Sequence, residues 1–213
     1  MSAITIEFDP FSFVVALIAV AISAAAYRAT RRAPLEARHQ EHRDEVRGAL
    51  RTAINSVAEP LEVLDEGRMP EGIPGGFATA RSVVNEVSPR LPEGNQLDQI
   101  GQDLGALLHY WGEAKKATKY EASVQGLTDQ AYAKVVHLAG QSSDATAKRY
   151  NDELAEMRSR LDAAKRTTEK ARDRLRKALL RFRIRAKKYV SEVDEQARGP
   201  QRKKLWRRRR ASL

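Results

Sequence analysis

Residues 154–182 read LAEMRSRLDAAKRTTEKARDRLRKALLRF, the most regular stretch of a 213-residue chain. Apolar or small residues recur there at every third or fourth position, which is the period of an α-helix that buries one face. Ser142 or Ser143 is expected to form an N-cap before the stretch, and Gly199-Pro200 a stop after it. The pattern predicts one long helix over residues 144–197. Its buried positions are expected to be Leu154, Met157, Leu161, Ala164, Thr168, Ala171, Leu175, Ala178 and Phe182.

A second long helix is predicted upstream, over residues 96–140. Leu97, Ile100 and Leu104 begin the same three-and-four spacing, which continues to the end of the segment. Only a short turn separates this helix from the next one, so we expect the two to form an antiparallel hairpin over residues 96–198.

Three glycines of the second helix, Gly101, Gly105 and Gly112, lie on one face of it. Each glycine costs a helix about 1 kcal/mol, so their presence needs a reason. Two reasons fit the pattern: the close approach of another helix, or a local break.

The segment before the hairpin predicts a helix over 34–66 with a kink or restart at Pro60, a loop over 67–76 and a short helix over 77–87. The chain is therefore predicted to be all-α, a helical bundle or antiparallel coiled-coil hairpin. The seam between the two long helices is rich in alanine and thin. A third helix or a second copy must complete it, and a homodimer and a closed monomer fit equally well.

Residues 10–27, PFSFVVALIAVAISAAAY, contain no charged residue. A helix of this length spans roughly 25 Å, near the short end of what crosses a bilayer. It is apolar on all sides, so we expect it to span the membrane and not to lie on its surface. Two alternatives are a buried core helix and a signal peptide cleaved near Ala24-Ala25-Ala26. The acidic residues before the segment argue against a signal peptide.

The flanks of this segment predict its orientation. Glu7 and Asp9 precede it, whereas Arg28 and Arg31 follow it, so the N-terminus is expected outside and the bulk of the chain in the cytoplasm, at the plasma (inner) membrane. The predicted organisation is a short external N-terminus at 1–9, a single transmembrane helix at 10–27, a juxtamembrane helix, short helix and loops at 28–95, the hairpin at 96–198 and a disordered polybasic tail at 199–213.

The net charge of +10 is distributed unevenly. Residues 148–213 carry 24 Lys/Arg against nine Asp/Glu, a net charge of +15, whereas residues 1–147 sum to −5. This basic arm predicts an anionic partner. The residues expected to contact it are Arg181, Arg183, Arg185, Lys187, Lys188, Arg202, Lys203, Lys204, Trp206, Arg207, Arg208, Arg209 and Arg210.

Three interpretations of the basic arm compete. It could lie on the anionic lipid headgroups of the inner leaflet, with Trp206 at headgroup level. It could bind nucleic acid, with arginines on phosphates and Trp206 stacked on a base. It could also be a solubilising tail without a defined partner. The membrane anchor favours lipid, because it holds the arm close to the bilayer.

The sequence offers little for enzymatic chemistry. There is no cysteine, and there are only four histidines. Glu36, His39 and His42 follow an i, i+3 spacing, but a di-iron bundle needs further ligands, so we interpret them as a solvated helix face. No nucleophile or phosphate-loop motif occurs. We therefore expect no enzyme activity, metal or cofactor. The predicted role is a membrane-anchored scaffold or tether, with a membrane-anchored nucleic-acid-binding protein as the alternative.

Overall fold

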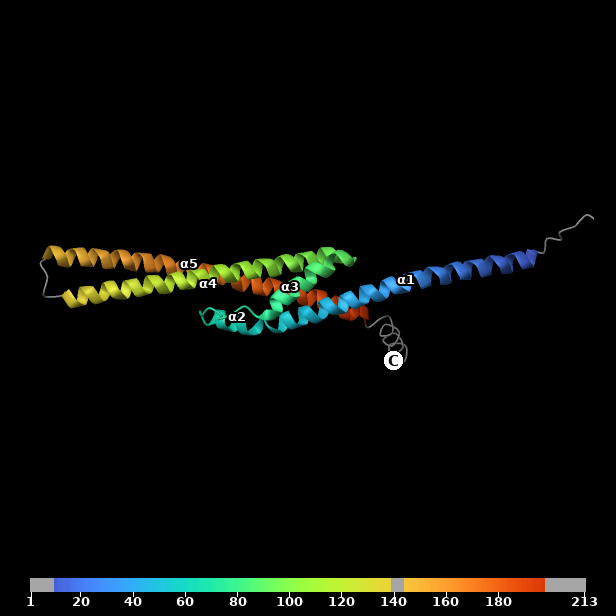
Figure 1. The fold of residues 1–213 in the computed structure, drawn as a ribbon, viewed down its shortest axis with the longest axis horizontal. Coiled ribbons are helices and arrows are strands. Elements are labelled where there is room, and N and C mark those ends of the chain that lie inside the picture. Colours follow the sequence, from blue (N-terminus) through green and yellow to red (C-terminus); the bar gives the residue numbers. More distant parts are fainter. Residues whose placement is uncertain (1–9, 139–143, 198–213) are drawn as a thin grey trace, which may run out of the picture. The chain divides into compact units, whose positions relative to one another are not determined.

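The computed structural model describes residues 10–138 and 144–197, and every regular element in them is helical. Within the described helices, the side chains of residues 10–13, 16, 29, 31, 32 and 144 are not described. The prediction of an all-α chain is thus confirmed for the described residues. The elements are α1 (Pro10–Asn55), α2 (Ala58–Asp65), α3 (Gly75–Val87), the 3₁₀ turn η1 (Ser88–Arg90), α4 (Gly94–Leu138) and α5 (Asp144–Ala197) (Figure 1).

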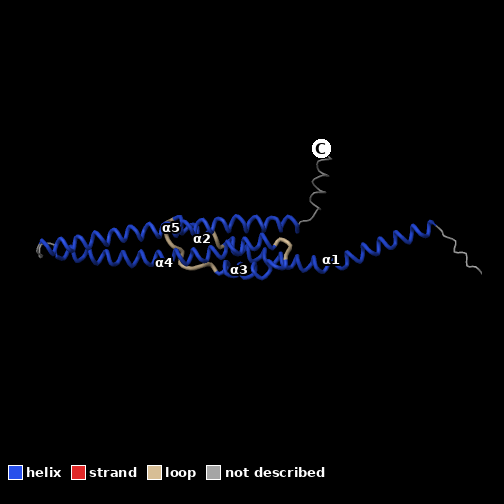
Figure 2. Tube along the Cα trace, turned by 90° about the horizontal axis from the view of Figure 1, so that it is seen from above, coloured by secondary structure: helices blue, strands red, loops and turns tan. Residues whose placement is uncertain are grey.

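The helices α4 and α5 run antiparallel and side by side in both views (Figures 1 and 2). The helix bounds follow the predicted ones closely, since α4 begins two residues before the expected start. The turn expected at 140–143 lies outside the described residues. The three-and-four spacing of apolar residues was therefore a sound guide to this part of the molecule.

Helical segments from the N-terminal half cover one half of this hairpin and create its core. Phe77 of α3, Trp111 of α4 and Phe182 of α5 are fully buried at the centre. The Phe77 ring meets Phe182 edge-on at 5.8 Å between centroids and lies 6.4 Å from the Trp111 ring. Such contacts add about 0.5–1.5 kcal/mol each to the free energy gained by burying the rings.

Small residues on α4 allow α3 to approach closely. A Cβ at Gly101 would lie 2.9 Å from the Asn85 side chain, and one at Gly105 would lie 3.5 Å from Arg81. Nothing lies within 4 Å of a Cβ at Gly112. α4 continues through all three positions, so a local break of the helix explains none of these glycines. The close approach of α3 explains Gly101 and Gly105, but it does not explain Gly112.

The other half of the hairpin consists of α4 and α5 alone, and its seam is thin. Val124, Ala131 and Leu154 are buried there, together with Thr128, whose hydroxyl donates to the Val124 carbonyl. Large side chains nearby remain more than half exposed. They are Tyr120, Leu127, Tyr132 and Val136.

The first predicted helix differs from the observed one at both ends. α1 starts at Pro10 and runs through Pro34 to Asn55, because residues 28–33 are good helix formers and one proline removes only one backbone hydrogen bond. The chain restarts as α2 at Ala58, with Pro60 in the first turn, where its missing N–H is not needed. The expected restart near Pro60 is confirmed, two residues earlier.

Contacts divide the chain into two units, residues 1–44 and 45–213. The described part of the first unit is the N-terminal portion of α1. The second unit contains the rest of α1 and all the other helices.

In the described residues, no helix carries an apolar run long enough to cross a bilayer. The structure therefore does not support the transmembrane helix expected at 10–27. Residues 17–27 are the longest part of this segment in which every side chain is described. They form about 16 Å of helix, whereas the hydrocarbon core of a bilayer is about 30 Å thick. Residues 10–13 and 16 of the expected span have side chains outside the described ones.

Candidate anion-binding surface

Seven basic residues of α5 form a row along one face of the helix, which we call the α5 basic stripe. Successive members are four, four, three, four, four and three residues apart, so their side chains stay on the same face. All seven are exposed, and the row is about 33 Å long. Its members are Arg166, Lys170, Arg174, Lys177, Arg181, Arg185 and Lys188.

A buried carboxylate on α4 holds one end of the stripe in place. The Asp103 side chain is only 8% exposed, and its Oδ2 accepts a hydrogen bond from Arg185 Nη1 at 2.9 Å. A buried charge is costly without a partner, so this pair fixes the register of α5 against α4. It also means that the charge of Arg185 is already balanced within the fold.

The other members of the stripe differ in whether they form ion pairs with acidic residues. Lys177 Nζ lies 2.6 Å from Asp173 Oδ2, and Lys188 Nζ lies 4.0 Å from Glu192 Oε1. Pairs of this kind on an exposed helix surface contribute little stability and are readily exchanged. In the described part of the chain, Arg174 and Arg181 have no acidic partner. These two guanidinium groups are the ones most available to an external anion.

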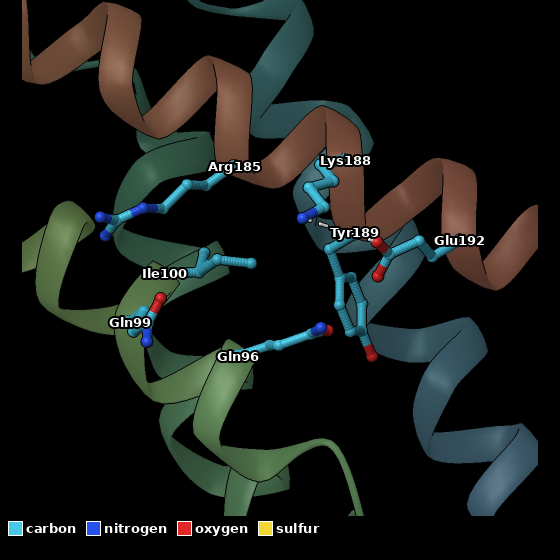
Figure 3. Close-up of a pocket in the computed structure, with 7 residues that line it drawn as sticks. All are labelled: Gln96, Gln99, Ile100, Arg185, Lys188, Tyr189 and Glu192. Atoms are coloured by element: carbon cyan, nitrogen blue, oxygen red, sulfur yellow. Dashed lines mark ion pairs between the residues drawn. The ribbon is translucent and has the colours of Figure 1, made fainter.

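Two hollows lie along the stripe, where α5 meets α4. The first has a volume of about 150 Å³ and contains the Lys188–Glu192 ion pair (Figure 3). The second, about 110 Å³, lies farther along the same groove and has Arg174, Lys177 and Arg181 on its α5 side. The first is lined by Gln96, Gln99, Ile100, Arg185, Lys188, Tyr189 and Glu192, and the second also by Asp103, Ala106, Tyr110 and Ala178.

A larger hollow of about 480 Å³ lies between α2 and the loop that follows it. Its walls are mainly proline, glycine and aliphatic side chains. Arg68, its one basic residue, donates a hydrogen bond to Glu66, and this bond together with the charge of the carboxylate raises the pKa of the guanidinium. No set of polar groups converges there, so we do not regard it as a candidate site.

The structure separates the five helical residues that the sequence grouped as the anion contact. Arg181, Arg185 and Lys188 belong to the α5 basic stripe. Arg183 and Lys187 do not, because two residues along a helix turn the side chain by about 200°. Arg183 is also half-buried. The predicted tail residues lie outside the described part of the chain, namely Arg202, Lys203, Lys204, Trp206, Arg207, Arg208, Arg209 and Arg210.

The opposite flank of α5 uses its arginines within the fold. Arg176 Nε donates to Asp65 at 2.6 Å, and Arg172 donates to the backbone carbonyl of Gly67. On the last turns of α5, Asp194 accepts hydrogen bonds from Arg51 at 2.6 Å and Arg47 at 3.3 Å. These contacts explain why a high arginine content in α5 does not translate into one uniformly free basic surface.

Four residues of the stripe were not singled out in the sequence: Arg166, Lys170, Arg174 and Lys177. The signal was present, because lysine and arginine recur there at the four-four-three spacing of a helix face. The consecutive basic residues of the tail are the more conspicuous signal in the sequence.

The candidate metal ligands of the sequence do not come together. No group of three His, Cys, Asp or Glu side chains among the described residues is placed to hold a metal ion. The His109 ring is on α4, where Nε2 lies 3.3 Å from Glu113 on the same helix.

The fold and this surface define an all-helical bundle protein with a basic groove along its longest helix. Neither a known protein family, nor a curated protein, nor a solved structure matches the chain.

Proposed function

We propose that this protein is a single-pass membrane-anchored helical scaffold whose α5 basic stripe, with the basic tail, contacts an anionic lipid surface. The observation that carries the proposal is the exposure of the apolar segment of α1. Its large aliphatic side chains, where they are described, are more than half exposed and point to all sides of the helix, so they do not form one stripe. They are Val14, Val15, Leu17, Ile18, Val20 and Ile22.

Lipid is the covering that suits such a segment. Exposed apolar area costs about 25 cal/mol per Å² in water, so a segment of this kind needs a cover. A partner helix buries one face of a helix, whereas hydrocarbon covers its whole circumference. Arginines follow the segment and acids precede it, which supports an N-out orientation with the bundle on the cytoplasmic side.

On the cytoplasmic side, the α5 basic stripe has a suitable partner in the lipid headgroups. The cytoplasmic leaflet is anionic, and each Lys or Arg close to it contributes about 1 kcal/mol. Ile184 is 68% exposed between Arg181 and Lys188, so an apolar side chain accompanies the charges, as is usual where helices bind membrane surfaces. α5 has 54 residues, about 81 Å of helix, which suits a spacer or tether.

Anchoring is tested by alkaline carbonate extraction of the full-length protein from membranes. We expect the protein to remain in the membrane pellet, and I18K/I22K to be released, because a lysine near the centre of a spanning helix costs about 2.5–3.5 kcal/mol. The control is L35K, which adds a lysine at an exposed position of α1 beyond the apolar segment. Release of the unmodified protein would overturn the anchor.

The tether is tested with two vesicle populations. Full-length protein in phosphatidylcholine vesicles should capture vesicles that contain phosphatidylserine and ignore neutral ones, with capture declining as salt rises. Absence of capture at low salt would remove lipid as the partner.

A second candidate function rests on the length and the neighbours of the stripe. A straight row of cations about 33 Å long, beside the amides of Gln96 and Gln99 and the ring of Tyr110, also suits a nucleic-acid backbone. If the protein fails to capture anionic vesicles but retards a DNA duplex or single strand in physiological salt, this second function replaces the first.

A further inference from the structure

We propose that the second hollow of the groove, between Arg174 and Arg181, is a binding site for a phosphomonoester group. This inference deepens the proposed function and rests on the stripe being an anion-binding surface. It adds that the stripe does not act only as a diffuse positive charge, because its centre contains a defined site for one chemical group.

The geometry of the three basic residues favours a compact anion. Arg174 and Arg181 are seven residues apart, two turns or about 10 Å along the same face, and Lys177 lies between them. All three line the hollow of about 110 Å³. Two guanidinium groups on either side of a small recess can each donate two parallel hydrogen bonds to phosphate oxygens.

The balance of charge at the hollow is also appropriate. Lys177 is paired with Asp173 and Asp103 with Arg185, so four basic and two acidic residues leave a net charge of +2. The excess belongs to Arg174 and Arg181. A phosphomonoester carries about −1.5 to −2 charges at pH 7, whereas a phosphodiester carries one. The site therefore matches the monoester better than the linking phosphates of a nucleic acid or of most lipids.

The walls of the hollow strengthen the interaction. Ala106 and Ala178 give it apolar sides, and Tyr110 of α4, half-buried, adds a hydroxyl that can donate a further hydrogen bond. Tyr110 thus adds a neutral hydrogen bond to the charged contacts of Arg174 and Arg181.

The neighbouring hollow shows the contrast. It contains Glu192, which lies 4.0 Å from Lys188, and its other basic residue is Arg185, already bound to Asp103 (Figure 3). Both of its basic residues are therefore paired with a carboxylate, so an anion gains little there. Arg174 and Arg181 are thus the specific feature of the groove.

The phosphomonoester could come from a lipid headgroup such as phosphatidic acid or from a soluble metabolite, and the experiment separates the two. Full-length protein in phosphatidylcholine vesicles is presented with vesicles containing either phosphatidic acid or phosphatidylserine, matched in surface charge. In parallel, glycerol 3-phosphate is titrated into the same protein by calorimetry. We expect several-fold stronger capture of the phosphatidic acid vesicles.

Two variants with equal loss of charge give the decisive comparison. R174Q/R181Q should abolish the preference for phosphatidic acid, while R166Q/K170Q, which removes two charges from the same stripe outside the hollow, should weaken capture of both vesicles and keep the preference. Circular dichroism checks that both variants fold. No preference in the unmodified protein together with no binding of glycerol 3-phosphate, or the same loss of preference in both variants, would overturn the site.

The soluble arm distinguishes failure of the site from failure of the proposed function. Binding of glycerol 3-phosphate that needs Arg174 and Arg181 supports the site even if no vesicle is captured, and then assigns it to a soluble ligand. Preference for phosphatidic acid without binding of the soluble compound assigns it to lipid. Absence of both effects, with capture of phosphatidylserine vesicles intact, would overturn the site and leave the proposed function standing.

Discussion

Asp103 lies on α4 with 8% of its side chain exposed, and its Oδ2 accepts a hydrogen bond from Arg185 of α5. The pair joins residues 82 positions apart in the chain, and Asp103 also lines the hollow proposed for the phosphomonoester group. Exposed pairs such as Arg160–Glu156 are formed within one helix and connect nothing else. The two kinds of pair therefore differ in what they contribute to stability.

Removing the carboxylate should make this difference measurable. We expect D103A to lower the free energy of unfolding by about 1–3 kcal/mol, because it removes a charge-assisted hydrogen bond that joins α4 to α5. E156Q breaks an exposed pair and should cost less than about 0.5 kcal/mol. Urea unfolding followed by circular dichroism checks both variants. Equal costs for the two substitutions would contradict the structural role of Asp103.

At the scale of the elements, most of the helices could be predicted from the sequence. The spacing of Leu97, Ile100 and Leu104 gave the second long helix, and Pro60 gave the restart of the chain. The continuity of α1 through Pro34 could not be predicted, because a single proline is compatible with both a boundary and a helix interior. Sequence spacing specifies which face a residue occupies on its own helix.

It does not specify what lies opposite that face, and the candidate site shows the consequence. The spacing of Arg166, Lys170 and Arg174 was visible in the sequence, as was the spacing of Arg172 and Arg176. Only the fold reveals that Arg176 meets Asp65, 111 residues away, whereas Arg174 meets no acid in the described part of the chain. The division of α5 into an internal and an available flank therefore needed the structure.

Two glycines of α4 should respond in opposite ways to the same change. G112A should raise the free energy of unfolding by about 0.5–1 kcal/mol, since nothing lies within 4 Å of the new Cβ and alanine favours helix. G94A should lower it by about 1–3 kcal/mol, because its Cβ would lie 2.6 Å from the Ser88 backbone oxygen. Thermal unfolding of both variants checks this, and a stabilising G94A would show that η1 is free to move away from α4.

At the scale of the whole molecule, the net charge of +10 conceals several distinct regions. The apolar segment of α1 has no charged residue. On one flank of α5, Arg172 and Arg176 form hydrogen bonds within the fold, whereas the opposite flank carries the exposed α5 basic stripe. The net charge or the apolar content of the whole chain therefore predicts neither the kind of partner nor the surface that binds it. The distribution over the faces of individual helices is the informative quantity.

The half of the hairpin where α4 and α5 stand alone has a consequence for exchange of backbone amide protons with solvent. Its seam contains small or polar residues such as Ala131 and Thr128, whereas the covered half is closed by Phe77, Trp111 and Phe182. We expect protection against deuterium exchange, followed by mass spectrometry, to decrease along α4 from Trp111 towards Leu138 and to increase along α5 from Leu154 towards Phe182. Uniform protection along both helices would mean that the two halves open as one unit. With the expected gradient, the uncovered half opens and closes many times for each unfolding of the bundle.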